Sequence, residues 1–257
     1  MKEAGFSSTR VEPLVGPTQP NDQHPASAPS RRSHEHLFFL GMAVLLLATV
    51  FVGFASSYYL AGMVNASLPS RIIHVHALVA TAWMLLFAAQ VSLASAHGVD
   101  LHRRLGVIAV PLACAMVVTG LMAGADILRR GIPPGLEHLL FLINTNMVLV
   151  FAVLIALAYR MRGAPPAHKR LVVMAHVALM FAGFIRWPVE FLYHNIPSAA
   201  RAPYSFLLLM VLYDLWSTRR VHPVTLWAGA FLVFVFEVQF LVADTMAWQA
   251  FAAWIRS

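Results

Sequence analysis

A short pattern of His, two basic residues and Leu occurs twice in this sequence, at His102–Leu105 and at His168–Leu171, and a long apolar run follows each copy. Another histidine precedes each copy near the start of the previous apolar run, His76 in the first case and His138 in the second. Neutral imidazole is a natural axial ligand of iron, and two imidazoles on facing helices of a four-helix bundle can hold a haem between them. If the runs are helices, this spacing predicts two histidine pairs.

The two expected pairs lie near opposite ends of the helices. His76 and His138 would form an outer pair, and His102 would form an inner pair with either His168 or His176. His176 lies about 12 Å deeper than His168 along a helix, so by depth His102 matches His168 better. The depths of His76 and His138 match more closely still, which favours the outer pair over the inner one.

Further ionisable residues fall within or beside the apolar runs, where an unpaired charge is costly and is a functional candidate by default. Arg186 and Glu190 are four residues apart and can pair on one helix face, and Glu237 falls in the outer half of the last run. These three side chains either form a transport or small-ligand site or only neutralise one another and hold helices together. His74 is two residues from His76, so on a helix the two cannot share a face.

A metal-dependent enzyme built on His74 or His76, His138 and Glu190 is a third interpretation of the same residues. The sequence has no His-Glu-x-x-His motif and no two histidines four residues apart on one apolar run, the spacings that would place two metal ligands on one helix face. This interpretation is therefore less favoured than the histidine pairs.

The composition indicates that this chain lies in a membrane rather than in water. Of its 257 residues, 60% are hydrophobic and only 11% are charged, with a mean hydropathy of +0.72, whereas a soluble domain has about a quarter charged residues. The single cysteine, Cys114, excludes a disulfide framework and a cysteine-based metal cluster. The net charge of +7 comes from basic residues placed in pairs between apolar runs, which is typical of membrane flanks rather than of nucleic-acid binding.

The apolar runs predict the architecture. Residues 1–35 are polar and rich in proline, and we expect a disordered tail. Residues 36–257 are expected to form one all-α, polytopic domain of seven transmembrane helices around a four-helix core made by the second to fifth helices, because each run approaches the roughly 20 residues that cross a bilayer. The runs are 37–60, 72–96, 105–128, 136–159, 170–192, 203–217 and 223–243. The short sixth run either begins earlier, near Ser198, or is buried by its neighbours, and residues 243–257 either continue the seventh helix or lie along the outer surface.

Basic residues predict the orientation. With the N-terminus inside, ten of them flank the inner ends of the runs and five flank the outer ends, which favours a cytoplasmic N-terminus and an external C-terminus. The inner ten are Arg31, Arg32, Arg103, Arg104, Arg160, Arg162, Lys169, Arg170, Arg219 and Arg220.

The phrase Leu101–Gly106 resembles the Leu-His-x-x-Leu/Val-Gly phrase that opens the third helix of di-haem transmembrane cytochromes b. That resemblance implies two b haems, ligated by the second helix with the fourth and by the third with the fifth. The span 37–254 also resembles a family of bacterial seven-helix membrane proteins with no assigned function, which implies a bacterial inner membrane. The phrases that carry this second resemblance are His74–Ala77, Trp83, Gln90, 100–106, Tyr213–Leu215 and Val221–Trp227.

Together these observations predict an integral membrane protein that binds haem b and transfers electrons. The candidate ligands are His76 with His138, and His102 with His168 or His176. A quinone or another redox partner would exchange the electrons, and the sequence leaves the oligomeric state open. A transporter or ligand-binding protein that uses the outer Arg, Glu and His residues is the alternative.

Overall fold

The computed structural model describes residues 29–60, 70–96, 98–131, 134–193 and 195–257. Most of the expected tail, residues 1–28, lies outside the described residues. The first helix, α1 (Pro29–Phe54), begins before the predicted boundary at residue 36, and a short π-helical segment, η1 (Ala55–Tyr59), extends it. Proline suits the first turn of a helix, where its missing N–H is not needed, and no further proline follows Pro29 in this run.

Seven helical segments are long and apolar enough to cross a membrane, which confirms the predicted all-α polytopic fold. The spans cover His34–Tyr59, Arg71–Ser95, Val99–Arg130, Glu137–Arg160, Pro165–Phe184, Ile196–Thr218 and Pro223–Ala243. Their helices are α1 with η1, α2 (Arg71–Ser95), α3 (Val99–Arg130), α4 (Glu137–Arg160), α5 (Pro165–Ala178) with α6 (Phe181–Phe184), α7 (Ile196–Arg201) with α8 (Tyr204–Thr218), and α9 (Pro223–Ala243).

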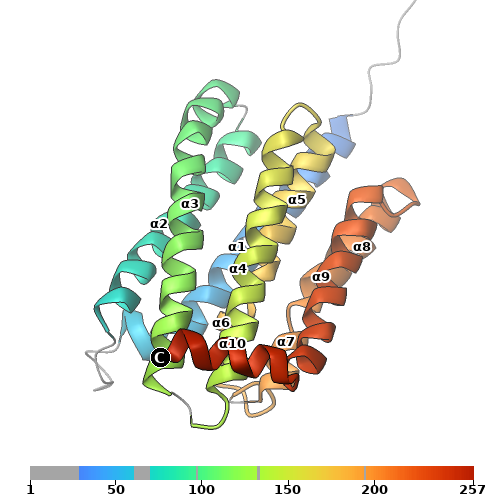
Figure 1. Ribbon diagram of the computed structural model, residues 1–257. Helices are drawn as coiled ribbons and strands as arrows, with labels where there is room; N and C mark the ends of the chain where they lie inside the picture. Colours follow the sequence, from blue (N-terminus) through green and yellow to red (C-terminus); the bar gives the residue numbers. More distant parts are fainter. Residues whose placement is uncertain (1–28, 61–69, 97, 132–133, 194) are drawn as a thin grey trace, which may run out of the picture.

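The spans alternate in direction, so the bundle has two distinct ends (Figure 1). We call the end where α1, α3, α5 and α9 begin the basic end; it lies at the top of Figure 1. The opposite end is the α10 end, named after α10 (Met246–Arg256), which runs across it. Helices α2 to α5 each pack against the next one along the chain, so this part of the bundle agrees with the expected four-helix core.

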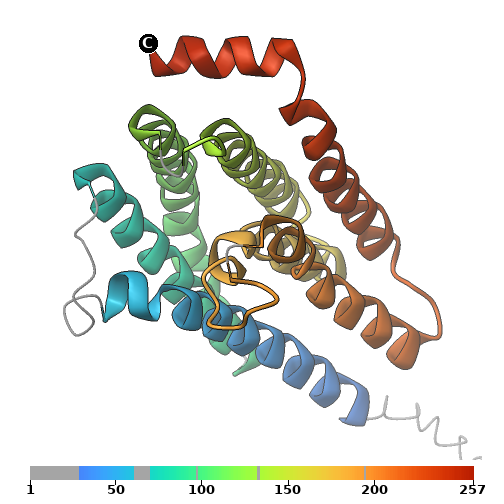
Figure 2. The same ribbon diagram turned by 90° about the horizontal axis from the view of Figure 1, so that it is seen from below.

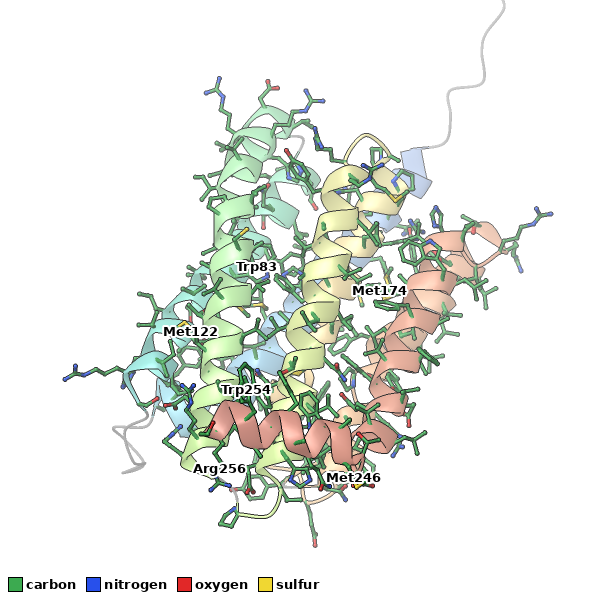
Figure 3. The ribbon with its side chains drawn as sticks, viewed as in Figure 1. Trp83, Met122, Met174, Met246, Trp254 and Arg256 are labelled. Carbon is green, nitrogen blue, oxygen red and sulfur yellow. The ribbon has the colours of Figure 1, made fainter. Side chains whose placement is uncertain are left out.

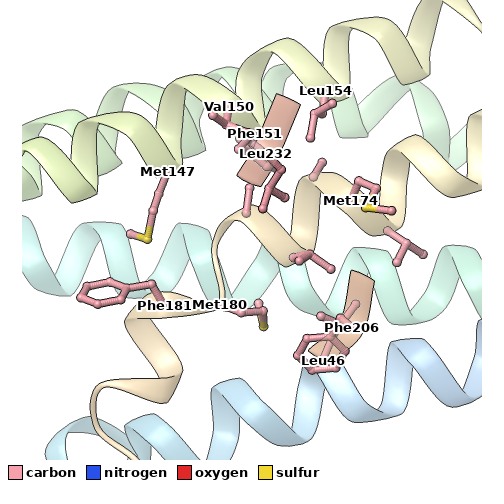
Figure 4. Close-up of a cluster of buried hydrophobic side chains, with 14 of the residues drawn as sticks. Leu46, Met147, Val150, Phe151, Leu154, Met174, Met180, Phe181, Phe206 and Leu232 are labelled. Atoms are coloured by element: carbon pink, nitrogen blue, oxygen red, sulfur yellow. The ribbon is translucent and has the colours of Figure 1, made fainter. Parts of the chain in front are cut away.

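The core is centred on α5, which is buried on most sides and carries mainly apolar residues. Leu171, Met174, Ala175 and Val177 have no exposed surface, and a helix that is apolar all round belongs inside a bundle. Figure 4 shows this cluster, in which side chains of α4, α5 and α9 meet; its labelled members are Leu46, Met147, Val150, Phe151, Leu154, Met174, Met180, Phe181, Phe206 and Leu232.

The fifth span ends earlier than the sequence predicted. We expected a helix over 170–192, but α5 gives way to a turn at Leu179–Met180, and the last helical turn of α6 ends at Phe184. Trp187 precedes Pro188, and a residue before proline is disfavoured in the helical conformation. The chain then returns through α7, so the sixth span begins at Ile196, close to the earlier start considered for it.

Two glycines let α1 and α6 approach closely. A Cβ added at Gly53 would lie 2.3 Å from the carbonyl oxygen of Gly183, whereas one added at Gly41, twelve residues earlier on α1, would meet no atom within 4 Å. The backbone cannot yield as a flexible side chain can, so the sequence at Gly53 is fixed by this contact.

We therefore expect Gly53→Ala to destabilise the fold by about 1–3 kcal/mol, the usual cost of overpacking. The matched control Gly41→Ala should be neutral or stabilise by up to about 1 kcal/mol, because alanine is the better helix former. Unfolding of the detergent-purified protein in increasing denaturant measures both. Equal midpoints for the two variants would show that α1 and α6 are not in this contact.

The last helix turns away from the seventh span. After Asp244, α10 runs across the ends of the other helices and lies at the edge of the bundle beside α3 and α4 (Figures 1 and 2). Ala252 is buried against Leu128 and Phe141. Of the two positions considered for residues 243–257, the structure therefore has the one along the surface.

The exposed side of α10 is amphipathic. Met246 is 87% exposed and Trp254 is 68% exposed, and both project from α10 in Figure 3, while Gln249 and Arg256 are the exposed polar residues next to them. A helix of this kind suits the membrane–water interface.

We expect lipids with brominated acyl chains to quench the tryptophan fluorescence of the protein. The quenched fraction should be smaller in Trp254→Phe, because this variant lacks a lipid-exposed indole. An unchanged quenched fraction would place α10 away from lipid.

Candidate functional site

His102 on α3 and His168 on α5 lie together at the basic end. Their ring centroids are 6.5 Å apart, and the ring planes are nearly perpendicular, at 87°. Both side chains are partly buried. Helices α3 and α5 both begin at this end, so the equal positions of the two histidines in the repeated pattern place them at similar depth. The structure thus brings together the inner pair predicted with His168.

Each of these histidines is fixed by a carbonyl of the preceding helix. His102 Nδ1 donates to the carbonyl oxygen of Gln90 on α2 at 3.3 Å, and His168 Nδ1 donates to that of Ala158 on α4 at 2.9 Å. Because a carbonyl only accepts, the proton must be on Nδ1, and the lone pair of Nε2 is left free. The repeat therefore extends from the sequence to the hydrogen bonds, since each Nδ1 donates to a carbonyl of the preceding helix.

His176, the other histidine considered for the inner pair, is fully buried on α5. Its Nδ1 donates to the carbonyl oxygen of Val172 at 2.7 Å, and its ring stacks on Phe87 with centroids 3.7 Å apart. Among the described residues no contact joins His176 with His102. His168 is the partner of His102 in this structure.

The expected outer pair is not brought together. His76 Nδ1 lies 3.1 Å from the hydroxyl of Thr119 on α3, and its Cε1 lies 3.5 Å from the position of a Cβ added at Gly120. His138 begins α4, where its backbone carbonyl accepts a hydrogen bond from Trp248 Nε1 of α10 at 3.0 Å. Within the described part of the chain, no hydrogen bond or ring contact links the two imidazoles.

The other polar residues singled out are also separate. His74 Nδ1 pairs with the hydroxyl of Tyr58 at 3.1 Å. Arg186 donates to the carbonyl oxygen of Ala182 at 2.6 Å and lies 4.7 Å from the ring centre of Phe54, and burial lowers its pKa.

The two glutamates of the expected outer cluster have other surroundings. Glu190 is exposed in the segment after α6. Glu237 pairs with Arg201 at 2.7 Å and accepts a hydrogen bond from Tyr204. The predicted pairing of Arg186 with Glu190 fails because α6 ends at Phe184, so no helix places the two residues on one face. Neither of them pairs with Glu237 in the described structure.

The basic end contains a buried ion pair that the sequence analysis did not predict. Arg170 was expected to be a flank cation, but its side chain is only 4% exposed and pairs with the fully buried Asp214 of α8. Asp214 also accepts from the hydroxyl of Thr225 at 2.6 Å and from the backbone N–H of His222 at 3.0 Å. This Asp214 cluster joins α5, α8 and the start of α9.

His222 caps α9 in a manner that depends on its protonation. Its Nδ1 accepts the backbone N–H of Val224 at 3.1 Å, which requires an unprotonated nitrogen. Burial, reinforced by the positive charge of Arg170, lowers the pKa of His222 from its ordinary value of 6.5, and the carboxylate of Asp214 only partly opposes this. The folded state therefore disfavours protonation more than the unfolded state does.

We expect this cap to make stability depend on pH. Its contribution is fully present above the unfolded-state pKa of about 6.5 and is lost as the pH falls below that value. In His222→Asn, whose side chain caps without titrating, the loss of unfolding free energy between pH 7.5 and pH 5.5 should be smaller than in the unsubstituted protein. An identical loss in both proteins would contradict the role of His222.

Comparison of the chain with protein-family models, with curated proteins and with solved structures gives no match. The function must therefore be argued from the site itself.

Proposed function

We propose that this integral membrane protein binds one haem b between His102 and His168 and transfers electrons at the basic end of the bundle. The observation that carries the proposal is the facing pair of imidazoles, each with Nδ1–H held by a backbone carbonyl. A histidine fixed in this way through its second nitrogen is the usual form of a metal-bound imidazole.

The separation of the pair fits one shared metal centre. The ring centroids of His102 and His168 are 6.5 Å apart, which is close enough for both Nε2 atoms to reach a single metal through bonds of about 2 Å each.

The number of protein ligands favours haem over a bare metal ion. A zinc site takes three or four protein ligands, and within the described residues no group of three or more His, Cys, Asp or Glu side chains could hold a metal. A haem would bring most of its iron ligands with it and would need from the protein only the two nitrogens that His102 and His168 would provide.

The side of α3 that carries His102 faces Gln90 of α2. Gly106 is one turn further on the same side of the helix, and a Cβ added there would meet only Gln90 Nε2, at 3.8 Å. Gln90 itself has a buried Oε1 without a hydrogen-bond partner. This free acceptor on the helix before His102 is a group that a bound ligand would use.

The protein's own residues would hold and surround the group. His102 and His168 would supply the axial nitrogens, and the carbonyls of Gln90 and Ala158 would keep both rings in the binding tautomer. Bound haem supplies one-electron oxidation and reduction. The exposed flanking cations Arg103 and Arg104 are next to His102 in the chain, where they favour an anionic electron donor or haem propionates.

A reduced-minus-oxidised visible spectrum tests the proposal. Protein expressed with haem supplementation and purified in detergent should show a Soret band and the sharp bands of a low-spin, bis-histidine haem. Protein that is folded, as shown by circular dichroism, and yet lacks a Soret band would refute the haem. A high-spin spectrum would refute the histidine pair.

We also propose that the basic end faces the cytoplasm of a bacterial inner membrane. The ten-to-five excess of basic residues at this end supports it, because positive charge is retained on the cytoplasmic side. A redox partner or quinone would then reach the haem from the cytoplasmic side. Accessibility of a cysteine introduced at Gly163, in the exposed turn between α4 and α5, tests the orientation.

A further inference from the structure

Two buried polar nitrogens lie in an otherwise apolar contact between α2 and α5. The ring of His176 has no exposed surface, and Trp83 is 5% exposed; Trp83 lies inside the bundle, well away from both ends (Figure 3). The two ring centroids are 5.6 Å apart, and the ring planes are within 15° of parallel. Phe87, one turn further along α2, stacks on the same imidazole.

The two nitrogens are complementary. His176 donates its Nδ1–H to Val172, so its Nε2 can only accept, whereas an indole Nε1–H can only donate. Neither His176 Nε2 nor Trp83 Nε1 has a hydrogen-bond partner among the described residues. A buried donor or acceptor without a partner costs about 1–3 kcal/mol. The contact therefore contains one unpaired donor, on Trp83, and one unpaired acceptor, on His176.

The Nε1–H of Trp83 cannot donate directly to Nε2 of His176. The indole N–H and the imidazole lone pair both lie in the planes of their rings, and stacked, nearly parallel rings do not direct them at one another. The nearest other unpaired group, on Gln90, does not accept the hydrogen bond of Trp83 either. Gln90 Oε1 is buried and also lacks a partner, but Gln90 lies two helical turns from Trp83, about 10 Å along α2.

We propose that α2 and α5 hold a bound water molecule that accepts the Nε1–H of Trp83 and donates to Nε2 of His176. One water satisfies both atoms, since it can accept and donate at once, and buried waters in proteins occupy such positions. The site is separate from the His102–His168 pair. It requires no haem, so it can be tested on protein prepared without haem and stands or falls independently of the proposed function.

Infrared difference spectroscopy of the full chain in lipid nanodiscs provides the test. Exchange of ordinary water for H₂¹⁸O should shift a narrow band of a weakly hydrated, internal water. We expect this band to be lost in Trp83→Phe and in His176→Phe, which keep a ring but remove the nitrogen. It should remain in His176→Gln, whose amide oxygen can accept, and in the matched control Trp227→Phe, which removes an exposed indole.

Persistence of the isotope-sensitive band in both phenylalanine variants would overturn the proposal, as would its absence from the unsubstituted protein. If Trp83→Phe does not fold, the nitrogen-15 NMR signal of His176 Nε2 in the unsubstituted protein decides. A chemical shift typical of a hydrogen-bonded acceptor supports the water, and that of a free lone pair refutes it.

Discussion

Asp214→Asn is expected to cost about 3–5 kcal/mol of unfolding free energy, the typical loss when one partner of a buried ion pair is removed. The substitution keeps the shape of the side chain but leaves the guanidinium of Arg170 without its counter-charge in a site from which water is excluded. Thr225 and the backbone N–H of His222 would also lose a charged acceptor. Denaturant unfolding in detergent, followed by circular dichroism, measures the effect.

Two further variants separate the buried charge from a general effect of polar loss. Glu237→Gln breaks the pair with Arg201, whose side chain is 51% exposed, and should cost no more than about 1 kcal/mol. The double variant Arg170→Met with Asp214→Leu should recover much of the stability that Asp214→Asn loses, because it leaves no unpaired buried charge. If Asp214→Asn and Glu237→Gln cost the same, the Asp214 cluster is not the buried pair described above.

His102→Leu and His168→Leu should each reduce the haem content to background. Loss of a mere hydrogen-bond partner of a ligand lowers metal affinity about 10–100-fold, and the loss of an axial ligand removes the bond itself. Pyridine haemochrome absorbance per mole of purified protein measures the content. The fold should survive, since both side chains are only partly buried and lie at the end of the bundle.

Leucine variants at the other end are the matched controls. His76→Leu and His138→Leu should retain haem, because their imidazoles do not face each other in the structure. The opposite result, with haem lost from these two variants and kept in His102→Leu and His168→Leu, would move the site to the α10 end. Loss in all four would point to a haem at each end, as in the di-haem cytochromes.

The membrane fold was predictable because it depends on run length alone. Each span needs enough consecutive apolar residues to cross the hydrocarbon, whichever neighbours it has. The contact between His102 and His168 has a related origin, although the sequence favoured the outer pair and left His176 open as the inner partner. Two copies of one pattern at the starts of two parallel spans put His102 and His168 at the same depth, and only the packing of α3 near α5 had to be added.

Burial depends on neighbouring helices, which the pattern along one helix does not predict. Arg104 and Arg170 hold the same position in the repeated pattern, yet Arg104 is exposed while Arg170 is buried. The difference arises because α8 and α9 cover that side of α5, and a pattern read along one helix contains no information on the helices that cover it. Asp214 is more than forty residues from Arg170 in sequence, so no local spacing announces the pair.

The outer cluster was mispredicted for a similar reason. Its geometry assumed a continuous helix through Arg186 and Glu190, but α6 ends at Phe184. It also assigned Glu237 to the wrong arginine. Arg201, the actual partner, is one of the five basic residues that flank the outer ends of the runs, and its charge alone predicted no pairing.

The position of α10 has a consequence for how the chain is assembled. Its docking surface belongs to residues inserted much earlier, since Ala252 packs on Leu128 and Phe141, and Arg256 pairs with Glu137 at 3.2 Å. The α3–α4 hairpin must therefore be in place before α10, which is made after it, can settle. Docking of α10 thus depends on the earlier insertion of these two helices.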